Sequence, residues 1–219
     1  VIWGLIPPVV ALLFIFWKDS LKTSHKFSWI LVVLLLASSL LIFSRNLIRN
    51  ESFENGMKGW LWAPHWYADE TNVYKQSAVD GRVSSDQHRL GYNSFKITNM
   101  QKGGSQRYGL LTQEIKIWPK AVYNATLYVK GRVDEESYWF SISDEWGRAS
   151  ARHYVPINNY NEWTPIGPIS LKADDSYTAF FKIISTAPAQ YYVDDVKLTL
   201  NVWASLKHIA GLETLPEAK

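Results

Sequence analysis

The sequence of 219 residues contains no cysteine, so no disulfide bond stabilises the protein. The five histidines show no H-x-x-x-H spacing, and there is neither a G-x-S-x-G nucleophile motif nor a glycine-rich phosphate loop. Two acidic clusters, at 134–136 and 144–145, lie at predicted turns, where acids usually face solvent rather than form a glycosidase pair. The net charge of +3 is too small to argue for nucleic-acid binding. These absences predict a non-catalytic protein.

Two long N-terminal runs carry no charged residue, Val1–Trp17 and Trp29–Phe43. Each is near the lower limit of about 17–25 residues that a helix needs to cross a bilayer. The spacer between them, residues 18–28, holds three lysines and one histidine against a single aspartate. This pattern predicts a transmembrane helical hairpin over residues 1–45. The alternative is a buried hairpin in a soluble protein, although Ile30–Leu36 is apolar on every face, unlike a surface helix.

The charge of the spacer predicts the orientation of the hairpin. Short basic loops stay on the cytoplasmic side, so residues 18–28 are expected inside and the chain after Arg45 outside. The lack of cysteine in an extracytoplasmic domain favours a bacterial envelope over an animal cell surface. We therefore expect an integral protein of the bacterial cytoplasmic membrane, with the lipid bilayer as a partner and an extracytoplasmic C-terminal domain.

Aromatic residues are unusually frequent, since Phe, Trp and Tyr make up 15% of the chain. Tryptophan and tyrosine gather where a membrane meets water. Four tryptophans are expected at that boundary: Trp3, Trp17, Trp29 and Trp60. The other rings must lie in a core or on a binding surface.

Alternation of apolar and polar residues is typical of the chain after the hairpin. In residues 123–130, Ala125, Leu127 and Val129 alternate with polar side chains, as in a strand with one buried face. Other strand candidates are 94–98, 111–117, 138–143, 152–155, 164–170, 177–184 and 191–200. Many short strands without a long helical pattern predict an antiparallel β-sandwich over residues 46–200. In the tail, residues 201–219, a short amphipathic helix is expected at Val202–Gly211.

Three segments of this region carry a family pattern. Asn46–Trp60 reads Asn-Leu-x-x-Asn-x-x-Phe-Glu and soon reaches Gly-Trp, Gly91–Ile97 begins with a Gly-x-x-Ser turn that leads into a strand, and Tyr191–Leu198 contains Val-Asp-Asp-Val. In this order and at these distances they resemble carbohydrate-binding modules of the galactose-binding-like jelly-roll group. The resemblance covers residues 46–200 and implies a jelly-roll sandwich, but a shared fold does not fix the ligand.

The resemblance also implies a structural calcium ion between the first and last strands. By similarity, Glu54 and Asp194 or Asp195 would be its side-chain ligands, and calcium prefers such oxygen donors. Glu51 stands where the family pattern has glycine, which adds an acid nearby. The alternative is that the aspartates only end a strand and Glu54 caps a loop.

Sugar recognition in such modules uses flat aromatic faces. The candidates for a sugar-binding platform are Trp62, Trp66, Tyr67, Tyr74, Trp139, Trp146 and Trp163. Each ring has an alternative role in core packing or in a contact with a membrane or a partner subunit. On its predicted strand, Trp139 lies on the opposite face from Tyr138 and Phe140, so one of the two faces is expected to expose its rings.

Two function classes follow from the sequence. In the first, the sandwich is a membrane-anchored module that binds glycan on the outer face of the membrane. In the second, it is a structural accessory subunit of a larger membrane complex, in which the sandwich contacts other subunits and binds no sugar. The aromatic content and the family resemblance favour the first class, and the tethering hairpin favours the second.

Overall fold

A computed structural model of the chain describes residues 45–64, 66–68, 74–76, 79–99, 109–133, 138–143, 149–154, 157–173, 175–185 and 189–209. The chain divides into two compact units, Val1–Arg45 and Asn46–Lys219. The predicted transmembrane hairpin falls outside the described residues, apart from Arg45. Among the residues that are described, no helix is both long and apolar enough to cross a membrane.

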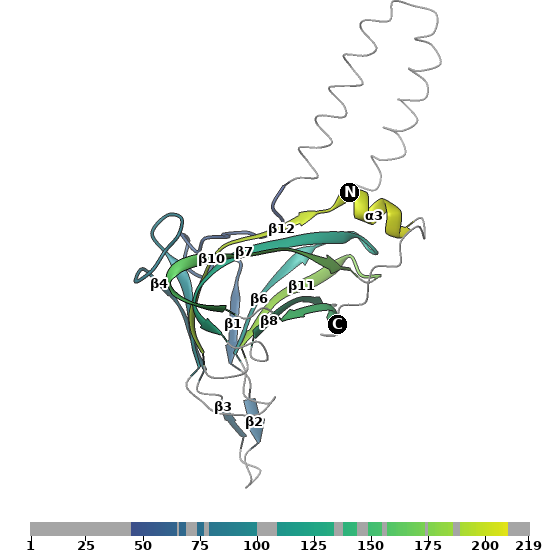
Figure 1. Cartoon of the computed structure of the whole chain (residues 1–219). Helices are drawn as coiled ribbons and strands as arrows, with labels where there is room; N and C mark the ends of the chain where they lie inside the picture. Colours follow the sequence, from purple (N-terminus) through teal and green to yellow (C-terminus); the bar gives the residue numbers. More distant parts are fainter. Residues whose placement is uncertain are drawn as a thin grey trace, which may run out of the picture. The chain divides into compact units, whose positions relative to one another are not determined.

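The second unit is a sandwich of two antiparallel five-stranded sheets (Figure 1). The first sheet has the order β1 (Leu61–Pro64), β6 (Gly109–Lys116), β11 (Thr178–Ser185), β8 (Tyr138–Ser143) and β9 (Ala149–Tyr154). The second sheet has the order β10 (Ile157–Lys172), β7 (Val122–Val133), β12 (Ala189–Leu200), β5 (Ser94–Asn99) and β4 (Val79–Ser84). A separate two-stranded ribbon pairs β2 (Trp66–Ala68) with β3 (Tyr74–Gln76). The predicted all-β antiparallel sandwich is confirmed.

Alternation explains how the strands build one core between the sheets. In β7 the side chains of Ala125, Leu127 and Val129 are fully buried, whereas Thr126 and Tyr128 on the opposite face are half-buried. Each of the eight predicted strands is present, seven of them within three residues of the expected bounds, while β10 begins seven residues earlier than expected. The strands β1, β2, β3 and β4 were not predicted.

Aromatic rings occupy the centre of this core. Phe53 lies 5.3 Å from Trp60 and 5.5 Å from Phe95, measured between ring centroids, and Trp60 meets Phe181 edge to face. Trp60 is 6% exposed, and its indole N–H donates to the carbonyl oxygen of Asn50 at 3.1 Å. The expectation that Trp60 marks the membrane boundary is therefore wrong, because the ring fills the interior of the sandwich.

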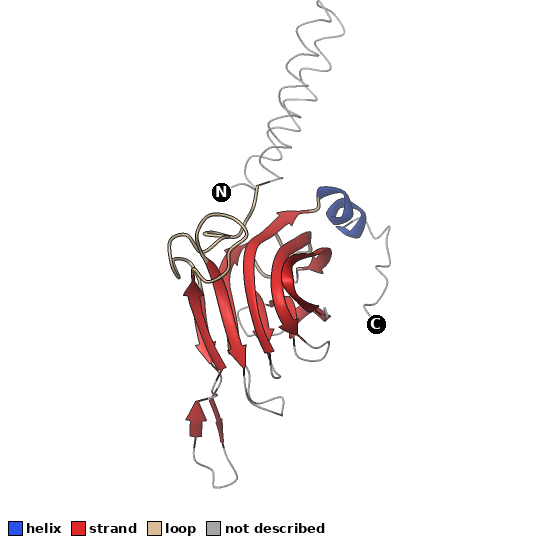
Figure 2. Cartoon of the chain, turned by 60° about the vertical axis from the view of Figure 1, so that its left-hand side comes forward, coloured by secondary structure: helices blue, strands red, loops and turns tan. Residues whose placement is uncertain are grey.

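The helix α3 (Val202–Ile209) follows β12 directly, as the sequence predicted. Asn201 caps its first turn by accepting a hydrogen bond from the amide of Ala204 at 3.0 Å. The side chain of Ser205 is buried against β7, where its hydroxyl accepts from the amide of Val122 at 2.8 Å. Figure 2 shows α3 at one edge of the strands and the β2–β3 ribbon beyond the opposite edge.

Candidate functional site

The loop of residues 85–93, which joins β4 to β5, is held on the second sheet by a buried carboxylate. One oxygen of Asp194 accepts the amides of Arg89 at 2.7 Å and Leu90 at 3.0 Å, and the other accepts the amide of Asp195 at 2.7 Å. Burial raises the pKa of the Asp194 carboxyl above its ordinary value, and the amide hydrogen bonds partly oppose that rise. The carboxylate therefore serves as the fixed acceptor for this loop.

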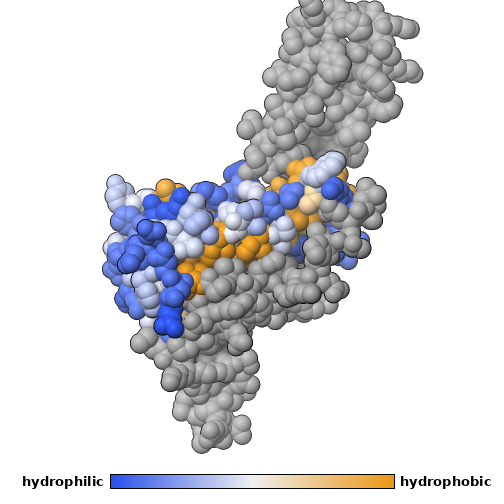
Figure 3. Space-filling model, in the orientation of Figure 1, coloured by the Kyte–Doolittle hydropathy of each residue, from blue (hydrophilic) through white to orange (hydrophobic). Residues whose placement is uncertain are grey.

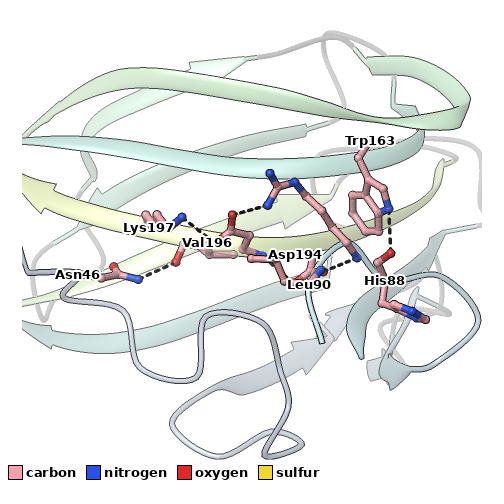
Figure 4. A network of polar contacts seen from close by, with 9 residues as sticks. Asn46, His88, Leu90, Trp163, Asp194, Val196 and Lys197 are labelled. Atoms are coloured by element: carbon pink, nitrogen blue, oxygen red, sulfur yellow. Dashed lines mark hydrogen bonds and ion pairs between the residues drawn. The ribbon is translucent and has the colours of Figure 1, made fainter. Parts of the chain in front are cut away.

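The neighbouring Asp195 is paired with two cations. It is 3% exposed, and its carboxylate oxygens lie 2.7 Å from Nη1 of Arg89 and 2.9 Å from Nζ of Lys197 (Figure 4). The guanidinium carbon of Arg89 also lies 3.4 Å from the ring centroid of Tyr128, which is a close cation–π contact. Arg89 thus joins the loop to both β12 and β7.

Glu54 holds the far side of the same loop. Its Oε1 accepts the amides of Tyr92 at 2.9 Å and Asn93 at 2.8 Å. Gly91 has a φ of +69°, and a Cβ at this position would overlap the Glu54 carboxyl group. The glycine lets the loop approach the carboxylate closely.

The three predicted calcium ligands are therefore brought to one loop, but their oxygens face N–H donors and cations. Asp194 and Glu54 accept backbone amides, and Asp195 is matched by Arg89 and Lys197. Within the described residues, no group of three or more His, Cys, Asp or Glu side chains is placed to hold a metal ion. This donor set does not fit a calcium ion, which needs several unoccupied oxygens. Calcium binding stays an untested prediction.

The loop in turn positions Trp163 on β10. The indole N–H of Trp163 donates to the carbonyl oxygen of His88 at 3.2 Å, and the ring is half-buried (Figure 4). The preceding loop residue, Gln87, accepts a hydrogen bond from Nζ of Lys130 on β7 at 2.7 Å. Because Gln87 and His88 are consecutive, Trp163 and Lys130 lie at the same place on the outer face of the second sheet.

The strand pairing shows which residues lie beside Lys130 on the neighbouring strands of the sheet. Lys130 pairs with Tyr192 on β12, Tyr192 pairs with Lys96 on β5, and Lys96 pairs with Arg82 on β4. We call Trp163, Lys130, Tyr192, Lys96 and Arg82 the outer band. Nζ of Lys96 lies 5.3 Å from the Tyr192 ring centroid, and hydrogen bonding to Tyr192 and Asp86 raises the pKa of Lys96. The band places an indole, a phenol ring and three cations in one row.

The other ring candidates are distributed differently. Trp62 packs on the core, 5.4 Å from Phe95 between ring centroids and against Gly81 and Gly109. This packing gives Trp62 a structural role. Trp139 precedes the buried Phe140 on β8 and pairs with Ile184.

The remaining ring candidates lie on the short strands β2 and β3 or outside the described residues. Trp66 and Tyr67 lie on β2 and Tyr74 on β3, where the backbone alone is described, as it is for Trp139. Trp146 lies outside the described residues. Of the two candidate rings whose side chains are described, Trp62 packs on the core and Trp163 joins a polar network.

Sequence reasoning missed Arg89, Lys130 and Tyr192. Alternation places Lys130 on the polar face of its strand, and that signal was available. The contacts of Arg89 join residues 106 positions apart, so only the folded chain reveals them.

No protein-family model and no curated protein matches the sequence. Solved structures do match. A proposed sugar-binding protein from Bacteroides thetaiotaomicron has a TM-score of 0.52 at 15% identity, over 72% of this chain and 100% of that one. The enzymatically active domain of tailspike protein 4 from bacteriophage CBA120 has a TM-score of 0.51 at 15% identity, over 71% of this chain. The chain spans 21% of the length of that tailspike structure.

Carbohydrate-binding modules are also among the matches. TmCBM61, solved in complex with β-1,4-galactotriose, has a TM-score of 0.48 at 18% identity, over 72% of this chain and 100% of that one. At such identities the likeness concerns the fold alone. The chain thus shares a β-sandwich fold with the Bacteroides protein and with the matched part of the tailspike domain.

Proposed function

We propose that the sandwich is a non-catalytic glycan-binding domain and that the glycan lies along the outer band. The observation that carries the proposal is the position of Trp163. Its N–H is fixed by His88, beside Lys130 and in the row that continues to Tyr192. A ring held in this way packs against the apolar face of a sugar with little loss of side-chain entropy.

The polar members of the band supply the complementary contacts. Lysine ammonium groups donate hydrogen bonds to hydroxyl or acidic groups of a sugar, and Tyr192 offers a second ring next to Lys130 and Lys96. Polar groups beside an aromatic surface are a common design of small-ligand sites. The sandwich fold, which the Bacteroides sugar-binding protein shares, supports this assignment.

We propose further that residues 1–43 anchor the domain in the bacterial cytoplasmic membrane, with the sandwich on the outer side. The support is the pair of charge-free runs around a basic spacer. Protease added to spheroplasts should then digest the sandwich and spare the hairpin. Protection of the sandwich, together with cleavage in the spacer, would reverse the orientation.

The test of glycan binding is calorimetric titration of the Asn46–Lys219 unit with a panel of neutral and acidic oligosaccharides. Trp163→Ala should weaken binding at least tenfold, since a ring buried against a sugar contributes roughly 1.5–3 kcal/mol. Trp203→Ala is the matched control, because Trp203 is 69% exposed on α3 and lies outside the band. It should bind like the unaltered domain.

The alternative function is that of an accessory subunit in a membrane complex. It is favoured by large exposed side chains beside the band, Leu90 at 46%, Tyr92 at 77% and Tyr160 at 58%. Purification from native membranes separates the two functions. Partner proteins that stay bound to a sandwich without affinity for any glycan would favour the subunit role.

A further inference from the structure

The helix α3 presents two large apolar side chains to solvent. Trp203 is 69% exposed and Leu206 is 55% exposed. They are three residues apart, so they lie side by side on one face of the helix. Ser205 on the opposite side is 6% exposed and hydrogen-bonded to Val122.

This exposure is built into the way the helix is attached. The carbonyl of Val122 accepts from the amide of Asn201 at 2.8 Å and from the hydroxyl of Ser205 at 3.2 Å. Asn201 also accepts at its carbonyl from the amide and hydroxyl of Ser205. With the helix fixed at both points, Trp203 and Leu206 stay turned outward. Figure 3 shows hydrophobic residues at the position that α3 occupies in Figure 1.

A lysine lies beside the apolar face, and further lysines lie on the neighbouring strand ends. Lys207 lies in the last turn of α3, and its Nζ is 5.6 Å from the ring centroid of Trp203. Further lysines lie at nearby ends of the strands. Backbone hydrogen bonds from Ala173 to Ala121 and from Ile117 to Tyr177 join these strand ends. Among the described residues at this edge, the cations are Lys116, Lys120, Lys172 and Lys207, and the acids are Glu114 and Asp175. Lys116 lies 3.0 Å from Glu114 and Lys120 lies 3.3 Å from Asp175, so Lys172 and Lys207 make up the surplus of cations at this edge.

The chain enters the sandwich beside this helix. Asn46 accepts from the amide of Leu198, and Leu47 donates to the carbonyl of Leu198 at 2.8 Å. Leu198 is four residues before the start of α3. Phe43, the last residue of the second apolar run, is three residues before Asn46, and three extended residues span at most about 11 Å. The link between the proposed anchor and the first residues of the sandwich is therefore short.

We propose that the Trp203–Leu206 face of α3, with Lys207, docks on an anionic phospholipid bilayer. The proposal rests on the membrane anchor proposed above and assigns the surface of the sandwich that meets the lipid. Tryptophan and leucine insert at the level of the headgroups, while lysines beside them attract anionic lipid. The contact would orient the domain so that β10 and the outer band are held in a fixed direction relative to the membrane.

The experiment is co-sedimentation of the Asn46–Lys219 unit, which has its own core, with vesicles of phosphatidylcholine alone or mixed with phosphatidylglycerol. The unaltered domain should bind the mixed vesicles. The double variant Trp203→Ser, Leu206→Ser should bind them at least tenfold less while melting like the parent, because both side chains are exposed.

Trp163→Ala is the matched control for vesicle binding. Thr164 pairs with Val129, seven residues along β7 from Val122, or about 23 Å at 3.3 Å per residue. The control should sediment like the parent domain. Failure of the parent to bind mixed vesicles, or equal binding by the double variant, would overturn the proposal. Glycan titration and spheroplast proteolysis report on the proposed function independently of this result.

Discussion

The loop of residues 85–93 and the helix α3 are fixed to the same sheet by opposite means. Charged groups turn inward from the loop, where Arg89 meets Asp195 and backbone amides meet Asp194. Apolar groups turn outward from the helix, which is held by hydrogen bonds of Asn201 and the buried Ser205 to Val122. The comparison shows that polar contacts position the loop, whereas the helix leaves apolar side chains exposed to solvent. We assign the first surface to glycan and the second to lipid.

The largest effect is expected at the polar centre of the loop. Asp194→Ala leaves the amides of Arg89, Leu90 and Asp195 without their acceptor, and each buried unsatisfied donor costs about 1–3 kcal/mol. We expect a loss of about 3 kcal/mol in the free energy of unfolding, measured in urea. Asp80→Ala, at an exposed position on β4, should change it by less than about 0.5 kcal/mol. Equal effects of the two variants on the free energy of unfolding would refute the role of Asp194 as the acceptor that holds the loop.

The region under α3 has its own buried titratable group. Burial raises the pKa of Tyr123 to about 12, from an ordinary value of 10.0. Because the folded state favours the neutral phenol, stability should fall as pH rises from about 10 to about 12, by up to roughly 3 kcal/mol. Burial also raises the pKa of Tyr191, so Tyr123→Phe should reduce the alkaline slope without abolishing it. An unchanged slope in the variant would assign none of it to Tyr123.

The cations of the loop provide the next test. Removal of Arg89 leaves Asp195, which is 3% exposed, with Lys197 alone, so Arg89→Ala should cost about 2 kcal/mol. Arg82→Ala, whose side chain is 64% exposed, is the matched control. If Arg89 and Lys197 balance the carboxylates, chelators should leave the melting temperature of the domain unchanged. Bound calcium predicts the opposite, a lower melting temperature after chelation.

The smallest effect is expected at the helix attachment. Ser205→Ala removes the hydroxyl that bonds both Val122 and Asn201, at a cost of about 1 kcal/mol. Vesicle binding should weaken in parallel, because Trp203 and Leu206 lose their fixed orientation. Hydrogen exchange of the α3 amides measures the loosening directly, and unchanged protection in the variant would contradict the role of Ser205.

Alternation made most of the sandwich predictable, and exceptions to alternation explain what was missed. In β4, Gly81 stands between Val79 and Val83 where an apolar side chain would complete the pattern. A Cβ at Gly81 would overlap the ring of Trp62, which fills that space. The strand β1 is four residues long and ends in Pro64, which suits its edge position but hides it from pattern analysis.

The candidate site was predictable only in part. The resemblance grouped Glu54, Asp194 and Asp195 as calcium ligands, and in the structure all three contact the loop of residues 85–93. It could not show that Arg89 would supply the opposing charge, since that contact depends on the path of the loop across β12. Of the rings expected on a platform, Trp62 lies among apolar residues and Trp163 among polar ones, but sequence neighbours alone do not show which ring packs on the core. The ring of Trp62 packs against Gly81 and Gly109, and this contact places it in the core.

The central claim is that glycan lies against Trp163 on the outer band. The most direct measurement is nuclear magnetic resonance of the ¹⁵N-labelled domain during titration with the oligosaccharide panel. The account predicts that at least one glycan shifts the indole N–H of Trp163 and the amides around Lys130 and Tyr192, while the indole N–H of Trp203 stays unchanged. Shifts confined to other surfaces, or no shift with any glycan, would contradict it.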